Sequence, residues 1–234
     1  MQEALSSTMV SEKQDIKDLV GKIWNEDCLK TMARMEDNSV DLVLTDPPYG
    51  IGENNERNMS RGKWSIPTNY GHYEWDNQKI DDIYFEEIKR ISKNQIIFGG
   101  NYYNLGSTSC YLVWDKDNGN SDFADAELAW TSFKSAVRIF KFKWQGMLQE
   151  NMKNKEKRYH PTQKPVELIR QILDRYSNPD ESIYDPFCGS GSILLAAQKL
   201  NHNWIGSEIN LEYCEIANKR ISAERNQTKL FLEV

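Results

Sequence analysis

The chain has 234 residues, of which 39% are hydrophobic and 27% are charged, and its formal net charge is −6 at pH 7. This length suits one well-buried α/β domain and is short for two. The acidic balance argues against a histone-like protein whose whole surface grips phosphate. The longest apolar stretches, such as Ile193 to Ala197, are far shorter than the roughly 18 residues of a membrane-spanning helix.

The N-terminal residues 1–20 are polar and mixed in charge, so we expect an extension there and not a signal peptide. A single domain is expected over residues 21–234. The cysteines are scattered without a Cys-x-x-Cys pair, so we expect neither a metal site nor a disulfide framework from Cys28, Cys110, Cys188 and Cys214. A reducing, cytoplasmic location fits this pattern.

Short β-like runs alternate with amphipathic helical stretches, which predicts an α/β fold with a mostly parallel central sheet and helices on both faces. In the first part of the chain we expect strands at 21–24, 40–45, 95–98, 110–114, 127–131 and 137–142, and helices at about 28–35 and 80–93. Residues 50–77 read as a long mobile loop and residues 145–159 as irregular. Later come helices at 165–176, 190–200 and 211–224, and strands at 182–185 and 204–208.

The first motif is a glycine turn between a predicted strand and a helix, Asp185-Pro186-Phe187-Cys188-Gly189-Ser190-Gly191. Glycines let the backbone turn sharply and let a ligand approach it closely. A dinucleotide fingerprint needs a further glycine where this chain has Leu194, which disfavours NAD. Glu208 ends the next predicted strand and is placed to accept ribose hydroxyls. Together these features indicate a nucleoside-binding crevice, although a purely structural tight turn would also explain the glycines.

The second motif follows the predicted strand 40–45 and reads Asp46-Pro47-Pro48-Tyr49. The exocyclic amine of a purine is a poor nucleophile because its lone pair is delocalised into the ring. If Asp46 and the Pro47 carbonyl accept its two N–H bonds, the nitrogen becomes pyramidal and its lone pair available. Tyr49 is then able to stack on the base. A simpler interpretation is that the two prolines only end the strand.

These motifs together resemble the amino-methyltransferases that act on DNA. Asp-Pro-Pro-Tyr precedes the glycine turn, and His160-Pro161-Thr162-Gln163-Lys164-Pro165 lies before that turn. This order resembles the circularly permuted β class, over about residues 23–220. The resemblance implies a Rossmann-like methyltransferase fold, S-adenosylmethionine as cofactor and double-stranded DNA as partner. A homodimer and a companion restriction enzyme are partners that the resemblance allows, whereas a membrane and a metal are not expected.

The resemblance also implies roles for individual residues. Asp185 holds the methionyl amino group, Glu208 the ribose, and Asp27 the adenine amine, with Glu26 in place of the usual glycine. His160 is expected to be structural or phosphate-facing and not catalytic. The implied catalytic residues are Asp46, Pro47, Pro48 and Tyr49. The implied cofactor-binding residues are Asp27, Cys28, Asp46, Thr162, Lys164, Asp185, Phe187, Cys188, Gly189, Ser190, Gly191 and Glu208.

The implied reaction is direct displacement of the methyl group by the N6 amine of an adenine flipped out of the duplex. No covalent enzyme intermediate is needed, so no cysteine serves as nucleophile. Cytosine-N4 methylation uses the same geometry, but that branch usually carries serine where this chain has Asp46; protein glutamine methylation is associated with asparagine. An RNA adenine is a further candidate substrate, and a non-catalytic nucleic-acid-binding subunit is a hypothesis of a different class.

Nucleic-acid contacts are expected from residues 50–77 and from the basic segment 138–159. Between Arg138 and Lys164 the chain has eight basic and only two acidic residues. Such a run is often only solvated surface. Trp64 or Tyr70 is a candidate to fill the gap left by a flipped base. The candidate phosphate or base contacts are Arg57, Arg61, Lys63, Lys153, Lys155 and Arg158.

Overall fold

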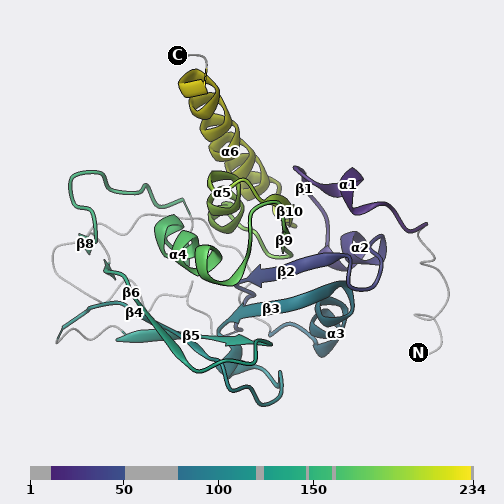
Figure 1. Ribbon diagram of the computed structural model, residues 1–234, viewed down its shortest axis with the longest axis horizontal. Coiled ribbons are helices and arrows are strands. Elements are labelled where there is room, and N and C mark those ends of the chain that lie inside the picture. Colours follow the sequence, from purple (N-terminus) through teal and green to yellow (C-terminus); the bar gives the residue numbers. More distant parts are fainter. Residues whose placement is uncertain (1–11, 51–78, 120–123, 146–147, 160–161, 233–234) are drawn as a thin grey trace.

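A computed structural model describes residues 12–50, 79–119, 124–145, 148–159 and 162–232, with only the backbone described for 228–232. The central feature is an eight-stranded sheet (Figure 1). Across the sheet its strands are β1 (Ile23–Trp24), β10 (Asn203–Ser207), β9 (Ser182–Asp185), β2 (Val40–Thr45), β3 (Ser92–Phe98), β5 (Ala126–Thr131), β4 (Leu112–Asp115) and β6 (Arg138–Lys141).

Most neighbouring strands in this sheet are parallel. The strands from β1 to β3 all run in the same direction, β5 is antiparallel to both β3 and β4, and β6 is parallel to β4. A separate antiparallel pair is formed by β7 (Trp144–Gln145) and β8 (Leu148–Gln149) within the segment predicted to be irregular. The predicted α/β class with a mostly parallel sheet is confirmed.

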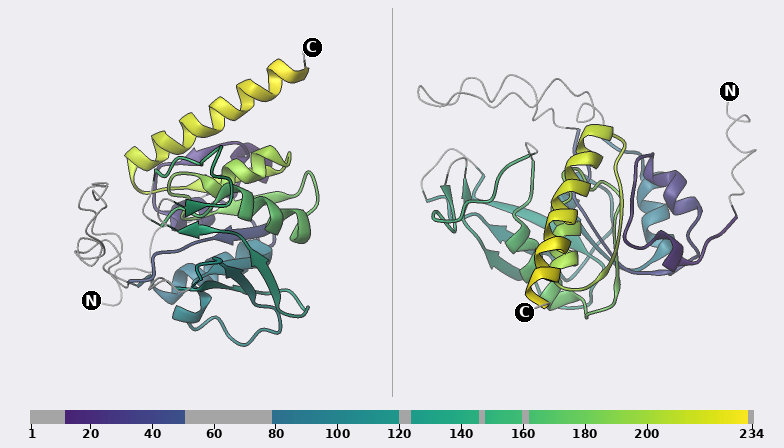
Figure 2. Two further views of the ribbon diagram at one scale, coloured as in Figure 1. Left: turned by 90° about the vertical axis from the view of Figure 1, so that its left-hand side faces the viewer. Right: turned by 90° about the horizontal axis from the view of Figure 1, so that it is seen from above.

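Helices cover both faces of the sheet, as Figures 1 and 2 show. Leu42 and Leu44 of β2 pack with the helices on one face, whereas Val43 packs with those on the other. This split follows from the alternation of side chains along a strand. The first face carries α4 (Val166–Tyr176), α5 (Ser192–Lys199) and α6 (Leu211–Leu232); the second carries α1 (Ile16–Leu19), α2 (Cys28–Ala33) and α3 (Asp82–Ile91).

The observed elements lie close to those predicted, and the largest difference is at α6. The strands at 40–45 and 182–185 have the predicted bounds, but α6 continues to Leu232 instead of ending near 224. The sequence after 224 contains no glycine or proline to stop it. Figure 2 shows this helix extending past the sheet.

Residues 12–20, which the sequence predicts to belong to a polar extension, contact the domain. The Leu19 side chain is 0% exposed and belongs to the core of the second face. The Lys13 ammonium donates to the Met35 carbonyl at 2.7 Å, and the Gln14 amide donates to the Arg34 carbonyl at 2.8 Å. Leu19, with Ile16 and Val20 packed against the same core, and these two hydrogen bonds to backbone carbonyls hold the segment in place. Its polar composition gave no indication of this packing.

The position of the functional motifs follows from the strand order. β9 and β2 are parallel neighbours, but the chain goes from β9 to β10 on one side and from β2 to β3 on the other. The segments that leave the carboxyl ends of β9 and β2 therefore diverge and leave a crevice between them. Asp185 ends β9 and Asp46 directly follows β2, so both carboxylates lie at this crevice.

Gly191 permits close packing between α5 and α6. It precedes α5 with a φ of +79°, and a Cβ atom there would lie 2.7 Å from the Cβ of Ala217 on α6. Both the left-handed conformation and the contact disfavour a side chain. Its place in the structure thus gives Gly191 a packing role.

We expect Gly191→Ala to lower the free energy of unfolding by about 3 kcal/mol, because backbone strain and overpacking add. Gly106→Ala is the matched control: its φ is +89°, but a Cβ there meets nothing within 4 Å. The control isolates the strain and is expected to cost about 1 kcal/mol. Urea unfolding measures both values, and equal losses would contradict a packing role for Gly191.

Candidate functional site

A cavity of about 490 Å³ lies at the carboxyl ends of β1, β2, β9 and β10, and both sequence motifs contribute to it. Most of the residues implied to bind cofactor or to catalyse line it, namely Asp27, Cys28, Asp46, Pro47, Pro48, Tyr49, Thr162, Lys164, Asp185, Phe187, Cys188, Gly189, Ser190 and Glu208. Gly191 does not line it. The topology therefore brings together five segments that are separated in sequence: 27–28, 46–49, 162–164, 185–190 and 208.

Asp185 is a buried acceptor at the tip of β9. Its Oδ1 atom accepts hydrogen bonds from the Thr45 hydroxyl at 2.8 Å and the Phe187 amide at 3.2 Å. Burial raises the pKa of the Asp185 carboxyl to about 8, although these hydrogen bonds oppose the shift. Among the described residues none donates to Oδ2, so a cationic group entering the cavity finds an acceptor there.

Glu208 joins the tip of β10 to the glycine turn. Its Oε2 atom accepts the Gly189 amide and its Oε1 atom accepts the Asn210 amide, each at 2.8 Å. Burial raises the pKa of the Glu208 carboxyl despite these bonds. A carboxylate oxygen has room for a second donor, so Glu208 remains able to accept a hydroxyl of a ligand.

Asp27 caps the N-terminus of α2 and also binds the hydroxyl of an aromatic side chain. Its Oδ1 atom accepts the Leu29 amide at 2.9 Å, and its Oδ2 atom accepts the Tyr84 hydroxyl at 3.0 Å. The Tyr84 ring lies against the Phe187 ring, with 5.9 Å between centroids. These two rings form an apolar wall of the cavity next to an acceptor, which suits a flat heteroaromatic ligand.

Several residues that line the cavity were not predicted from the sequence. Tyr84 comes from α3, and the helical periodicity of that segment does not indicate that its first turns face the motifs. Asn210 lies two residues after Glu208, and its side chain accepts the Glu212 amide at 2.9 Å at the start of α6. Asparagine is a common residue at helix starts, and this preference was the sequence signal that could have placed Asn210 beside Glu208. The unpredicted lining residues include Ile80, Tyr84, Gln163, Ser192, Ile193, Ile209, Asn210 and Tyr213.

Both carboxylate oxygens of Asp46 already have donors within the protein. Oδ2 lies 2.5 Å from the Lys164 ammonium, and Oδ1 accepts the Tyr49 hydroxyl. Burial raises the pKa of the Asp46 carboxyl, and the Lys164 charge acts against that shift. Pro48 is fixed through its carbonyl, which accepts the Tyr103 hydroxyl at 2.5 Å. Among the described residues no donor reaches the Pro47 carbonyl, which remains available to a ligand.

Tyr49 is packed between protein groups. Its ring stacks on Tyr102, with centroids 4.9 Å apart and an interplanar angle of 24°. A Cβ atom on Gly99 would lie 2.1 Å from the Tyr49 ring, so the ring requires a glycine there. The predicted stacking of Tyr49 on a base stays a prediction, since Tyr102 already covers one face of the ring.

A second polar network holds the segment around Thr162 and Lys164 in place. Gln163 donates to Glu156 at 2.7 Å, and Glu156 pairs with Arg220 of α6 at 3.1 Å. Arg220 also donates to the Ser190 carbonyl at 2.6 Å, at the glycine turn. This network connects the polar segment before α4, the glycine turn and α6.

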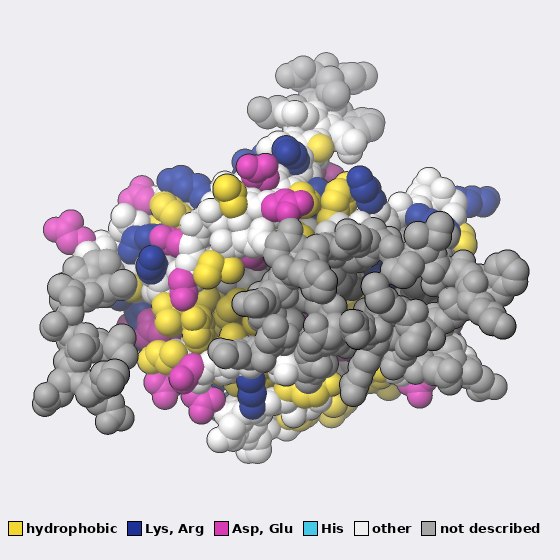
Figure 3. Space-filling view, turned by 180° about the vertical axis from the view of Figure 1, so that it is seen from behind, with side chains coloured by type: hydrophobic (Ala, Val, Ile, Leu, Met, Phe, Trp, Pro, Cys, Tyr) yellow, Lys and Arg dark blue, Asp and Glu magenta, His cyan; other side chains and the backbone are white. Residues whose placement is uncertain are grey.

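The basic segment is placed differently from the cavity residues. Lys153 and Lys155 are exposed, and Arg158 is half-buried with its guanidinium 5.3 Å from the Trp144 ring centroid. None of the three lines the cavity. In the described part of the face in Figure 3, basic and acidic side chains are interspersed. Nucleic-acid contact by these three residues stays a prediction.

Other predicted residues lie outside the described part of the chain. These are Arg57, Arg61, Lys63, Trp64, Tyr70 and His160, together with almost all of the segment 50–77. Within the described residues, no three His, Cys, Asp or Glu side chains are grouped so that they could hold a metal ion. No described helix combines the length and apolar character that crossing a membrane requires.

The raised pKa of Asp185 predicts a pH-dependent stability difference. With a pKa near 8, the folded protein binds more protons than the unfolded chain between about pH 4 and 8, so its stability falls as pH rises. Asp185→Asn removes this effect. Relative to wild type, the variant should gain up to about 1.4 kcal/mol per pH unit across this window and level off above it.

Urea unfolding of the ligand-free protein at several pH values measures this difference. Asp174→Asn, at an exposed aspartate of α4, is the matched control. Its free energy of unfolding, plotted against pH, should run parallel to that of wild type. Parallel curves for Asp185→Asn and wild type would show that Asp185 titrates normally.

A model of the family N6_N4_Mtase, described as DNA methylase, matches residues 113–219, somewhat less than half of the chain. The Type II methyltransferase M.HinfI of Haemophilus influenzae is 26% identical over 261 residues, covering 89% of this chain and 70% of the relative. Similarity to this Type II methyltransferase is therefore modest in identity but extends over most of the chain, whereas the DNA methylase model matches only residues 113–219.

Solved structures show the same fold. The M1.HpyAVI–SAM complex matches with a TM-score of 0.53 and 24% identity, over 85% of this chain and 98% of the other. The cytosine-N4-specific PvuII DNA methyltransferase matches with a TM-score of 0.55 and 14% identity, over 86% and 89% of the two chains. The chain therefore has the Rossmann-like α/β methyltransferase fold predicted from its sequence, and it is similar in sequence to Type II methyltransferases.

Proposed function

We propose that the protein is an S-adenosylmethionine-dependent DNA methyltransferase that methylates the exocyclic N6 amine of a flipped adenine. The observation that carries this proposal is the shared cavity of Asp46, Asp185 and Glu208. A methyl donor held by the last two residues lies next to an amine held by the first. The DNA methylase similarity over residues 113–219 and the Type II relative support DNA as the substrate.

The residues of the cavity fit S-adenosylmethionine. The buried Asp185 carboxylate, with Oδ2 facing no described donor, suits the methionyl ammonium. Glu208 suits the ribose hydroxyls, and the wall of Tyr84 and Phe187 beside Asp27 suits the adenine. When bound, S-adenosylmethionine supplies an activated methyl group on a sulfonium for direct displacement. The M1.HpyAVI structure of the same fold is a complex with SAM.

The residues after β2 orient the acceptor. Asp46 and the Pro47 carbonyl each accept one N–H bond of the target amine, which frees the nitrogen lone pair. The hydrogen bond from Tyr103 to the Pro48 carbonyl keeps this turn rigid. Because the groups are fixed before the substrate arrives, most of the acceleration comes from positioning and preorganised dipoles. Direct displacement forms no covalent enzyme intermediate, so none of the four buried cysteines is required as a nucleophile.

Cytosine-N4 methylation is the second candidate. It uses the same cavity geometry, and one protein of the same fold, PvuII, is cytosine-N4-specific. Asp46 favours adenine, since the cytosine branch of the family that the sequence resembles usually carries serine there. An RNA adenine is accommodated equally by a cavity that receives only the flipped base.

Asp46→Ala tests the assignment of the acceptor site. We expect methyl transfer to DNA to fall by at least roughly 100-fold, because the amine loses its acceptor. Binding of S-adenosylmethionine, measured by titration calorimetry, should stay within about twofold of wild type, a change of less than about 0.5 kcal/mol.

Asp174→Ala, at an exposed position of α4, is the control and should retain full activity. Asp46→Asn covers the case in which the alanine variant fails to fold. Loss of cofactor binding together with activity, in a folded variant, would count against Asp46 as the acceptor residue.

A further inference from the structure

A chain of alternating charges runs from the antiparallel part of the sheet to the cavity. Lys116, directly after β4, pairs with Oε1 of Glu127 on β5 at 2.5 Å. Oε2 of Glu127 lies 3.2 Å from the Lys164 ammonium, which in turn lies 2.5 Å from Asp46. Two cations and two anions therefore alternate over four residues, and the last of these residues lies at the proposed acceptor site.

Lys164 is the buried centre of this chain. Its side chain is 5% exposed, and its ammonium also lies 5.2 Å from the centroid of the Phe98 ring. Burial lowers the pKa of Lys164, but Asp46 and Glu127 outweigh that effect and raise the pKa above its ordinary value. A buried ammonium with two carboxylate partners is charged and held in one place.

This arrangement differs from the role that the family resemblance implies for Lys164. In the family that the sequence resembles, the residues at the positions of Thr162 and Lys164 lie near the methionyl carboxylate. Binding that carboxylate requires an ammonium that is not already neutralised by other anions. Here the ammonium already serves two carboxylates of the protein. Because the four charges balance, the cluster offers no net positive charge to a third anion. Lys164 is therefore better placed to act on Asp46 than on the cofactor.

The groups facing Asp46 come from several elements. Lys164 lies before α4, Glu127 on β5, Tyr49 in the same turn, and Asp185 at the tip of β9. Lys164 lowers the pKa of the Asp46 carboxyl, whereas Glu127 raises it. The two partners thus act in opposite directions on the charge of Asp46.

We propose that Lys164 and Glu127 are positioning residues, with Lys164 holding the Asp46 carboxylate in place for the target amine and Glu127 holding Lys164. This inference rests on the proposed function, since the Lys164–Asp46 ion pair can position a substrate only if Asp46 binds the target amine. Lys116 completes the chain by fixing Glu127 from the end of β4, the strand next to β5. The antiparallel strands thereby contribute to a site that otherwise belongs to the parallel ones.

The test compares Lys164→Met and Glu127→Gln with wild type. Removing the Lys164 charge raises the pKa of Asp46, so the acidic limb of the kcat profile moves to higher pH. Removing the Glu127 charge lowers that pKa, so the limb moves to lower pH. We expect kcat to fall roughly 100-fold in Lys164→Met and about tenfold in Glu127→Gln, because the carboxylate loses its fixed position.

Three further measurements separate positioning from a general structural role. The affinity for S-adenosylmethionine should stay within about twofold in both variants, a difference of less than about 0.5 kcal/mol. Carbon-13 NMR titration of the Asp46 carboxyl in the ligand-free protein should show the same opposite shifts without any catalysis. Lys164→Arg should recover part of the lost rate, since it keeps the charge.

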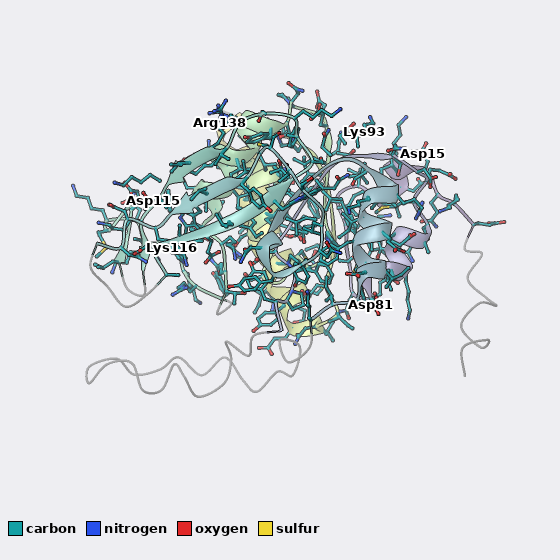
Figure 4. The ribbon with its side chains drawn as sticks, turned by 90° about the horizontal axis from the view of Figure 1, so that it is seen from below. Asp15, Asp81, Lys93, Asp115, Lys116 and Arg138 are labelled. Atoms are coloured by element: carbon teal, nitrogen blue, oxygen red, sulfur yellow. The ribbon has the colours of Figure 1, made fainter. Side chains whose placement is uncertain are left out.

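The control is Lys93→Met, which breaks an exposed ion pair with Asp41 of 2.6 Å. Figure 4 labels Lys93 and Lys116 and shows them well apart. This variant should leave the pH profile unchanged. If wild type is active but the pH profiles of Lys164→Met and Glu127→Gln do not shift, or shift in the same direction, this inference is wrong while the proposed function stands. No methyl transfer by wild type, with the opposite NMR shifts present, would instead overturn the proposed function.

Discussion

The reversal of strand order between β9 and β2 is the constraint on which the rest of the site depends. From these two parallel neighbours the chain continues to opposite sides of the sheet, so the described segments that leave their carboxyl ends diverge. The residues that end these strands, Asp185 and Asp46, then face one cavity although they lie far apart in sequence. The same arrangement brings Glu208 and Asp27 to the rim, because β10 and β1 continue the parallel set.

The electrostatics of the cavity are dominated by carboxylates. Burial raises the pKa of Asp46, Asp185 and Glu208, because the charged form of each carboxyl is poorly solvated inside the cavity. Lys164 offsets this for Asp46 alone. Asp185 has no cation of its own among the described residues, so a ligand with a positive charge relieves its burial. S-adenosylmethionine carries a positively charged amino group that suits Asp185 and ribose hydroxyls that suit Glu208.

Much of this arrangement could be predicted from the sequence, and what could not has a physical reason. The β-branched run 40–45 and the glycine turn after 185 specify local structure, so their positions and the fold class followed directly. Tyr84, Glu127 and Glu156 gave no such signal, because their roles come from tertiary contacts between distant elements. Leu19 shows the same limit: one buried side chain ties down a segment that is polar by composition.

The most direct test of the account is transfer of labelled methyl groups from S-adenosylmethionine to unmethylated genomic DNA, followed by digestion to nucleosides and mass spectrometry. Methylation of adenine at N6 predicts label in N6-methyladenine. Label in N4-methylcytosine would contradict the assignment of the base but keep the arrangement of Asp46, Asp185 and Glu208. Absence of label in DNA, from a protein that binds S-adenosylmethionine, would contradict the proposed DNA substrate.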